Sequence, residues 1–151
     1  SDHPGATLTL AGYGSEETRL RRLAARLGTD GIRFAGRVEP EDVPALYEDA
    51  DIFVNSSVID NQPVSILEAF ASGLPVVSTA TGDIPAMVGS GDRGLLVPPD
   101  TPEAMARAVA ALLRDPRRAV GMTRRARQAI PEYAWPSVRE AWAAVYGGGT
   151  P

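Results

Sequence analysis

The segment that begins at Asp60 combines an acidic loop with the start of a helix. Pro63 suits the first helical position, because the N–H that proline lacks would have no acceptor there. The backbone N–H groups of the next residues would then point out of the helix start, where the helix dipole is positive. Such groups bind anions, above all phosphate. The segment therefore predicts a phosphate site formed by the N–H groups of Val64, Ser65 and Ile66.

Glu68 follows about one turn later on the same predicted helix. A carboxylate does not bind phosphate, but it accepts hydrogen bonds from hydroxyl groups such as those of a sugar. Gly73 then ends the helix and Pro75 prevents its continuation. Without these neighbours, Glu68 would be interpreted as a surface carboxylate that stabilises the positive end of the helix. A phosphate site beside an acceptor for hydroxyl groups instead indicates a nucleotide sugar.

The composition of the chain limits its class. Its 151 residues, 44% of them hydrophobic, are enough for one ordinary globular domain. A formal net charge of −4 gives no reason to expect nucleic-acid binding. The absence of cysteine excludes a thiol nucleophile, and His3, the one histidine, lies too near the N-terminus for a catalytic triad. No apolar run approaches the roughly 20 residues that span a bilayer, so we expect a soluble, cytoplasmic protein.

Short apolar runs alternate with amphipathic segments along the chain, which is the pattern of an α/β fold. We expect strands at 7–11, 32–35, 51–55, 76–78 and 94–97. We expect helices at 16–27, 43–50, 64–72 and 84–88, and three more that begin near 101, 117 and 136. This order predicts a Rossmann-like parallel sheet flanked by helices on both faces. Ligands of such sheets bind at the carboxyl ends of the strands, here at 12–14, 36–38, 56–61 and 79–82.

Two further patterns in the sequence resemble an NAD site and a metal site, but neither has the features that such a site needs. Gly12 and Gly14 follow the first predicted strand, but the dinucleotide fingerprint also needs a third glycine and an acidic residue about 20 positions on. The chain lacks the third glycine, and the second predicted strand, 32–35, is followed by Gly36 and Arg37 and not by an acidic residue, so an NAD site is not expected. Asp49 and Asp51 resemble a pair of ligands for a divalent cation. They lie between a helix end and a strand start, away from the predicted ligand loops, so we expect no metal site.

The run LEAFASGLPVV at 67–77 is the most distinctive part of the sequence. Together with the runs at 10–14, 32–38, 46–56 and 94–97, it resembles the C-terminal, donor-binding domain of GT-B glycosyltransferases, in particular the retaining family 4 type. The resemblance implies the C-terminal half of a GT-B fold that lacks its first strand and helix. It also implies that the N-terminal, acceptor-binding domain is missing, so that the chain alone would be an inactive fragment.

The resemblance also implies roles for single residues. Members of the family have two acidic residues separated by seven others, of which the first contacts the transferred sugar and the second the ribose. These correspond to Asp60 and Glu68, although the family usually has the longer glutamate at the first position. Backbone groups would approach the diphosphate and the sugar at Asn61, Pro63, Val64 and Ser65. The base would meet Gly36, Arg37 and Val38, with the turn at Gly12 and Gly14 close to the ligand.

We therefore interpret residues 1–146 as a nucleotide-sugar-binding domain and residues 147–151 as a disordered tail. The preferred hypothesis is a retaining glycosyltransferase that moves a glycosyl group from a nucleoside-diphosphate sugar to an acceptor, without a metal. The alternatives are a sugar-nucleotide-binding module without transferase activity and a GT-B epimerase. The expected partners are the nucleotide sugar and the N-terminal domain. A basic run forms either a solvated helix face or a peripheral membrane contact: Arg117, Arg118, Arg124, Arg125 and Arg127.

Overall fold

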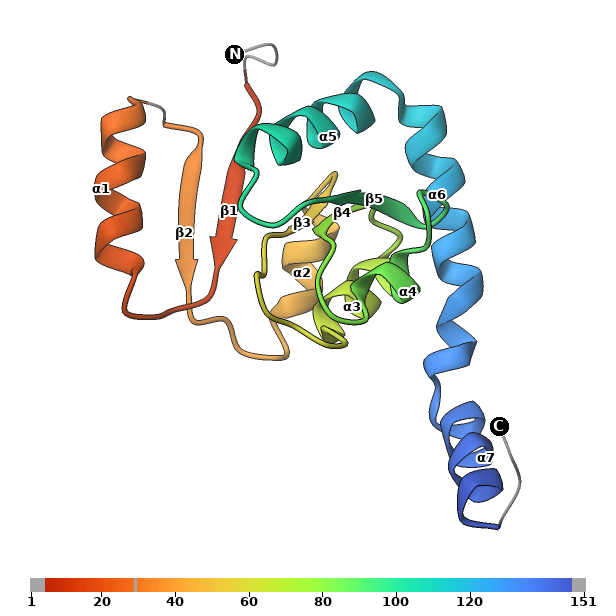
Figure 1. Cartoon of the computed structure of the whole chain (residues 1–151). Helices are drawn as coiled ribbons and strands as arrows, with labels where there is room; N and C mark the ends of the chain where they lie inside the picture. Colours follow the sequence, from red (N-terminus) through yellow and green to blue (C-terminus); the bar gives the residue numbers. More distant parts are fainter. Residues whose placement is uncertain (1–4, 29, 148–151) are drawn as a thin grey trace. The chain divides into compact units, whose positions relative to one another are not determined.

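The chain divides into two compact units, and the boundary in the sequence falls between Leu46 and Tyr47. The computed structural model describes residues 5–28 and 30–147. In both units parallel strands are connected through helices, which confirms the predicted α/β class (Figure 1). Gly147 follows the last helix, and the rest of the predicted tail, 148–151, lies outside the described residues.

The first unit is a βαβ arrangement. It contains β1 (Leu8–Ala11), α1 (Glu17–Leu27) and β2 (Ile32–Gly36), and its two strands are parallel. α1 ends at Gly28, whose φ of 61° places it in the left-handed conformation that glycine adopts at helix ends. None of the described residues in this unit is fully buried, so the described part of the unit forms no closed hydrophobic core.

The second unit contains a three-stranded parallel sheet. α2 (Val43–Glu48) leads into β3 (Phe53–Asn55), and the sheet continues through β4 (Val76–Thr79) to β5 (Gly94–Val97). β4 lies between the other two strands. Within the first unit β1 pairs with β2, and within the second unit β4 pairs with β3 and β5; all of these pairs are parallel, as the sequence predicted. Alternation of strands with helices specifies that the strands run parallel, but it does not specify which strands pair.

The helices of the second unit lie close to their predicted positions. α3 and α4 have the predicted bounds, because a glycine with positive φ follows each of them. α6 begins after Asp115, whose carboxylate accepts a hydrogen bond of 3.0 Å from the backbone N–H of Arg118. The helices are α3 (Val64–Ser72), α4 (Ile84–Val88), α5 (Pro102–Arg114), α6 (Pro116–Ala129), the 3-10 helix η1 (Ile130–Tyr133) and α7 (Trp135–Tyr146).

The central strand β4 organises the core of the second unit, because successive side chains of a strand point to opposite faces of the sheet. Val76 packs in one cluster with Phe70 of α3. Val77 packs in another cluster with Leu112 of α5 and Met122 of α6. All five side chains are almost completely buried. The sheet of this unit is therefore covered on both faces, as the sequence predicted.

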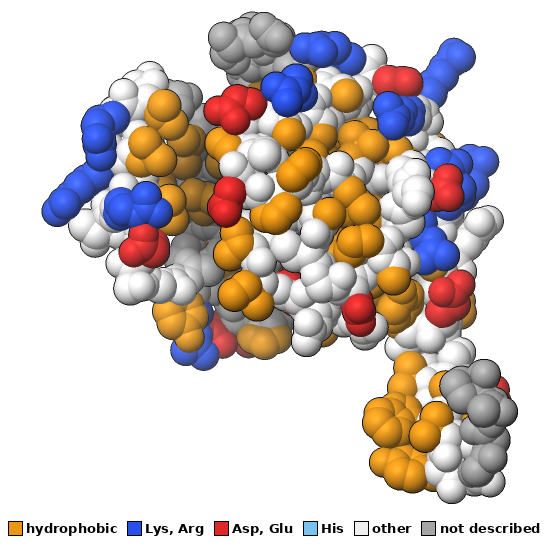
Figure 2. Space-filling model, in the orientation of Figure 1, with side chains coloured by type: hydrophobic (Ala, Val, Ile, Leu, Met, Phe, Trp, Pro, Cys, Tyr) orange, Lys and Arg blue, Asp and Glu red, His pale blue; other side chains and the backbone are white. Residues whose placement is uncertain are grey.

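The last helix, α7, exposes large apolar side chains. Trp135 is 69% exposed and Tyr146 is 81% exposed. Figure 2 shows the hydrophobic side chains gathered on this helix. The rings of Trp142 and Tyr146 stack with their centroids 5.6 Å apart. Within the described residues, none of the helices combines the length and the apolar character that a membrane span needs.

Adjacent leucines of α5 provide a test of this core. Leu112 is 2% exposed and Leu113 is 37% exposed. We expect Leu112→Ala to lower the free energy of unfolding by about 2–5 kcal/mol, because it leaves a cavity beside Val77. Leu113→Ala, the matched control, removes the same atoms from a partly solvated site and should cost much less. Urea denaturation of both variants measures the difference, and equal losses would contradict the assigned orientation of α5.

Candidate functional site

The start of α3 differs in one respect from the prediction. Pro63 was expected at the first helical position, but its ψ of 118° places it just outside the helix, as the N-cap. Its carbonyl oxygen accepts a hydrogen bond of 3.1 Å from the N–H of Ile66. The sequence predicted that the N–H of Ile66 would be available to a ligand, and this prediction is wrong. The N–H groups of Val64 and Ser65 lie in the first turn, where an α-helix supplies no acceptor. The helix start thus offers two donors to an anion.

The carboxylate of Glu68 is held by a tyrosine from a different segment of the chain. The hydroxyl of Tyr47 lies 2.9 Å from Oε2 of Glu68 and 3.2 Å from the backbone oxygen of Ser65. A phenol has one proton to donate, and the shorter distance and the negative charge favour the carboxylate as its acceptor. No described residue donates a hydrogen bond to the other oxygen, Oε1. Tyr47 therefore orients Glu68 and leaves Oε1 available.

The protonation state of Tyr47 suits this role. Burial raises the pKa of the Tyr47 phenol, and both the hydrogen bond to Glu68 and the charge of Glu68 raise it further. The phenol is consequently neutral over the physiological pH range and remains a hydrogen-bond donor. The side chain of Tyr47 also packs against Phe53, with ring centroids 5.8 Å apart, which fixes its direction.

The loop that carries Asp60 is fixed by the residues that precede α4. A Cβ atom at Gly82 would overlap the backbone oxygen of Asp60, so only glycine allows the two segments to approach this closely. The N–H of Asp83 donates a hydrogen bond of 3.1 Å to the backbone oxygen of Asn61. The side chain of Gln62 donates one of 3.4 Å to the carboxylate of Asp83. The backbone at 60–62 is therefore held at several points.

The side chain of Asp60 is left available by this arrangement. Asp60 is half-buried, and its carboxylate accepts no hydrogen bond from the described residues. A carboxylate on a fixed backbone without a protein partner is suited to accept hydrogen bonds from a ligand. The structure thus agrees with the predicted location of Asp60 in a loop directly before α3.

A polar network anchors the beginning of the same loop. The amide of Asn55 donates to the hydroxyl of Ser78, and its oxygen accepts from both the N–H and the hydroxyl of Ser57. The backbone oxygen of Ser57 in turn accepts hydrogen bonds from the hydroxyls of Thr79 and Thr81. Ser78 and Thr79 are buried, so these bonds satisfy polar groups that would otherwise destabilise the fold. The network joins the carboxyl ends of β3 and β4.

The glycine loops predicted to bind the nucleotide lie in the first unit. The N–H of Gly12 donates a hydrogen bond of 2.8 Å to the backbone oxygen of Gly36, and both glycines have positive φ. The guanidinium of Arg37 donates to Glu39 at 3.0 Å. The backbone oxygen of Gly14 accepts a hydrogen bond from the N–H of Glu17 at the start of α1. The structure therefore brings Gly12 and Gly36 together within this unit. Val38 is half-buried.

Metal ligands are not clustered in the part of the chain that the structure describes. Within residues 5–28 and 30–147, no three side chains of histidine, cysteine, aspartate or glutamate are placed to hold an ion. The described side chains that can serve a ligand here are instead single acceptors, Asp60 and Glu68, beside backbone donors at the start of α3. This arrangement fits an anion that also carries hydroxyl groups.

Sequence reasoning did not assign a role to Tyr47 or Asp83, nor a structural role to Gly82. Tyr47 lies 21 positions before Glu68, and nothing in a local pattern connects the two. Gly82 was predicted only as the end of the ligand loop 79–82, and its close approach to Asp60 was not expected. A glycine at the carboxyl end of a buried strand was the one available signal, because it permits a close approach of backbones.

A family model described as glycosyl transferases group 1 matches residues 1–115. The chain belongs to this family. It is 33% identical over 138 residues to the D-inositol 3-phosphate glycosyltransferase of Corynebacterium urealyticum, with 90% of this chain and 32% of that protein covered. It is 34% identical over 146 residues to the glycogen synthase of Mycobacterium tuberculosis, with 95% of this chain and 35% of that protein covered. The chain thus spans about a third of the length of these curated relatives.

A solved structure shows the same fold. Anabaena HepE, crystallised in complex with UDP, superposes on this chain with a TM-score of 0.85 at 21% sequence identity. The superposition covers 97% of this chain and 42% of that protein. The fold is that of the C-terminal domain of a GT-B glycosyltransferase, which confirms the resemblance that the sequence motifs predicted.

The close approach at Gly82 can be tested with a second glycine of positive φ in the same unit. Gly73→Ala places a side chain at φ 79° with only an ordinary contact, and should lower the free energy of unfolding by about 1–2 kcal/mol. Gly82→Ala should cost clearly more, because the backbone at Asp60 must also move. Urea denaturation compares the two variants. Equal costs would show that the contact with Asp60 is not a constraint.

The raised pKa of Tyr47 predicts a pH dependence of stability. The folded state holds the phenolic proton more tightly than the unfolded state, whose tyrosines ionise near pH 10. The protonated phenol therefore contributes its full share to the free energy of unfolding below about pH 10, and this contribution is lost as the pH rises above that value. We expect Tyr47→Phe to reduce this alkaline loss in urea unfolding between about pH 9 and 11. Tyr146→Phe, which changes an exposed phenol, is the control. If Tyr47→Phe leaves the slope of the free energy of unfolding against pH unchanged, the hydrogen bond from Tyr47 to Glu68 is not the cause of the alkaline loss.

Proposed function

We propose that this chain binds a nucleoside-diphosphate sugar and serves as the donor-binding part of a retaining glycosyltransferase. The observation that carries the proposal is the carboxylate of Glu68, oriented by Tyr47 one turn after the unpaired N–H groups that begin α3. A nucleotide sugar presents both hydroxyl groups and a diphosphate. These match the two kinds of group that the helix start offers.

Each group at the site has a role in this proposal. Oε1 of Glu68 accepts hydrogen bonds from the ribose hydroxyls, while Tyr47 holds Oε2. The N–H groups of Val64 and Ser65 contact the diphosphate, where the positive end of the helix dipole stabilises the charge. Asp60, on its fixed loop, contacts the transferred sugar.

The chemistry follows from these contacts. Glycosyl transfer passes through an oxocarbenium-like transition state in which the bond to the departing diphosphate breaks. Negative charge then accumulates on the diphosphate, and backbone N–H groups that are already oriented stabilise it without reorganisation. We propose that no metal is needed. The acceptor binds to another part of the whole protein, as the length of the relatives supports.

The relatives support the proposal at the level of reaction class. Both curated relatives carry names of glycosyl-transferring enzymes, and HepE was crystallised with UDP. UDP is accordingly the first nucleotide to test. A cytoplasmic location completes the proposal, and the basic run of α6 forms either a solvated helix face or a peripheral membrane contact.

One observation favours a second candidate, a module that binds the nucleotide sugar without transferring it. Asp60 is one methylene shorter than the glutamate that the family usually has at this position, so its carboxylate reaches less far from the loop. The backbone at 60–62 is fixed by Gly82 and Asp83, and cannot move forward to compensate. Donor binding would survive this change while transfer would not.

Calorimetric titration with UDP, GDP and ADP tests the proposed site. We expect one of them to bind, and Glu68→Ala to weaken it at least about tenfold, because a hydrogen bond to a charged group is lost. Glu103→Ala, an exposed glutamate in the first turn of α5, is the matched control and should leave affinity unchanged. Affinity that is insensitive to Glu68→Ala would contradict the proposal.

Product analysis of the whole protein separates the functions that share this site. A retaining transferase releases the nucleoside diphosphate and forms a product with the anomeric configuration of the sugar donor. An epimerase changes the sugar without releasing the nucleoside diphosphate. Binding without either reaction, at full length and with acceptor present, would identify the non-catalytic module.

A further inference from the structure

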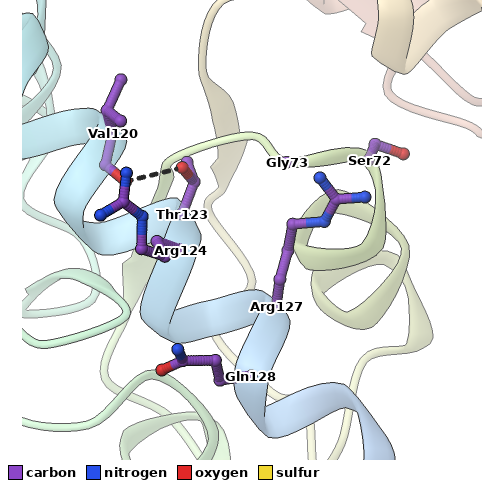
Figure 3. A pocket seen from close by; sticks show the side chains of 7 residues that line it. All are labelled: Ser72, Gly73, Val120, Thr123, Arg124, Arg127 and Gln128. Carbon is purple, nitrogen blue, oxygen red and sulfur yellow. Dashed lines mark hydrogen bonds between the residues drawn. The ribbon is translucent and has the colours of Figure 1, made fainter.

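A polar pocket lies at the opposite end of α3 from the proposed donor site. Its volume is about 550 Å³, and it is formed by the last residue of α3, its glycine cap and one face of α6 (Figure 3). α3 has nine residues, so its two ends are roughly 13 Å apart along the axis. The lining residues are Ser72, Gly73, Val120, Thr123, Arg124, Arg127 and Gln128.

The pocket has an excess of positive charge. Arg124 and Arg127 both line it, and none of its lining residues is acidic. Across the described residues, no ion pair with a carboxylate is found for Arg124 or Arg127. The two arginines are three positions apart on one helix, where like charges destabilise each other. An anion between them would remove this repulsion.

The arginines differ from their neighbour Arg125, which is already engaged. The guanidinium of Arg125 donates a hydrogen bond of 2.8 Å to the backbone oxygen of Asp92. Arg127 instead reaches toward the end of α3, where Nη1 lies 3.9 Å from the position of a Cβ at Gly73. Stabilising the negative end of α3 does not account for both arginines. The N–H groups of Gly73 and Leu74 already bond to the carbonyls of its last turn.

Uncharged side chains also line the pocket. Ser72 and Gln128 have no hydrogen-bond partner among the described residues, so they can donate to an oxyanion. The hydroxyl of Thr123 donates to the backbone oxygen of Val120 at 3.0 Å, and its lone pairs remain free to accept from a protonated phosphate oxygen. Guanidinium groups bind phosphate through pairs of parallel hydrogen bonds.

We propose that this pocket binds a phosphate group between Arg124 and Arg127. The phosphate belongs either to a soluble phosphate ester or to the headgroup of an anionic lipid. Both sources present negatively charged phosphate oxygens to the same two guanidiniums. The site is separate from the proposed donor site, because no residue that lines it belongs to the start of α3.

Nuclear magnetic resonance of the arginine Nε–H groups tests the site in the whole protein. Inorganic phosphate should shift the resonances of Arg124 and Arg127 saturably, whereas chloride at equal ionic strength should not. Arg124→Gln should weaken the binding reported by Arg127 about tenfold, and Arg127→Gln should do the same for Arg124. Arg117→Gln, on the same helix but outside the pocket, is the matched control and should change nothing.

A second pair of measurements separates the two sources of phosphate. Glycerol 3-phosphate represents the soluble ester, and vesicles of phosphatidylcholine with and without phosphatidic acid represent the lipid. Shifts with the ester, and vesicle binding that is equal in all variants, assign the soluble source. Vesicle binding that Arg124→Gln and Arg127→Gln weaken, but Arg117→Gln does not, assigns the headgroup.

Two outcomes would overturn the proposal. The first is the absence of a saturable shift with phosphate together with vesicle binding that neither pocket variant changes. The second is a loss of phosphate or vesicle binding in Arg117→Gln that equals the loss in the two pocket variants. Such a result would indicate general attraction to a basic helix. Neither outcome depends on nucleotide binding at Glu68, so the two proposals fail independently.

Discussion

The burial of β4 on both faces is the constraint on which the second unit depends. Val76 and Val77 point in opposite directions, and each fixes helices against its own face of the sheet. A short strand of four residues can hold this position because its neighbours, β3 and β5, pair with it in parallel on both edges. The carboxyl ends of β3 and β4 are then joined through Asn55, Ser57 and Ser78, which places the loops that follow them.

The candidate site combines a fixed backbone with available side-chain oxygens. The loop at 60–62 cannot shift without moving Gly82 and Asp83, yet the carboxylate of Asp60 accepts no hydrogen bond from the described residues. The carboxylate of Glu68, by contrast, accepts a hydrogen bond from Tyr47 at Oε2, and its Oε1 remains available. Such preorganisation lowers the cost of binding, since the acceptors are oriented before a ligand arrives.

The two ends of α3 present different chemistry. At its start, backbone N–H groups and the helix dipole favour an anion, and carboxylates supply acceptors for hydroxyl groups. At its end the dipole is negative, so an anion there requires side-chain cations, and α6 supplies them from Arg124 and Arg127. In the two proposals, α3 therefore separates two anion sites, and each site draws its positive charge from a different source.

The sequence alone determined what is local. The bounds of α3 follow from Pro63 and Gly73, and the parallel α/β class follows from alternating apolar runs. The motif at 67–77 identified the family, and the acidic residues at 60 and 68 followed from it. Tertiary structure decided what depends on distant segments: which strands pair within each unit, the bond from Tyr47 to Glu68, and the contact of Gly82 with Asp60. Local patterns encode φ, ψ and periodic burial, whereas such contacts arise only when packing brings remote residues together.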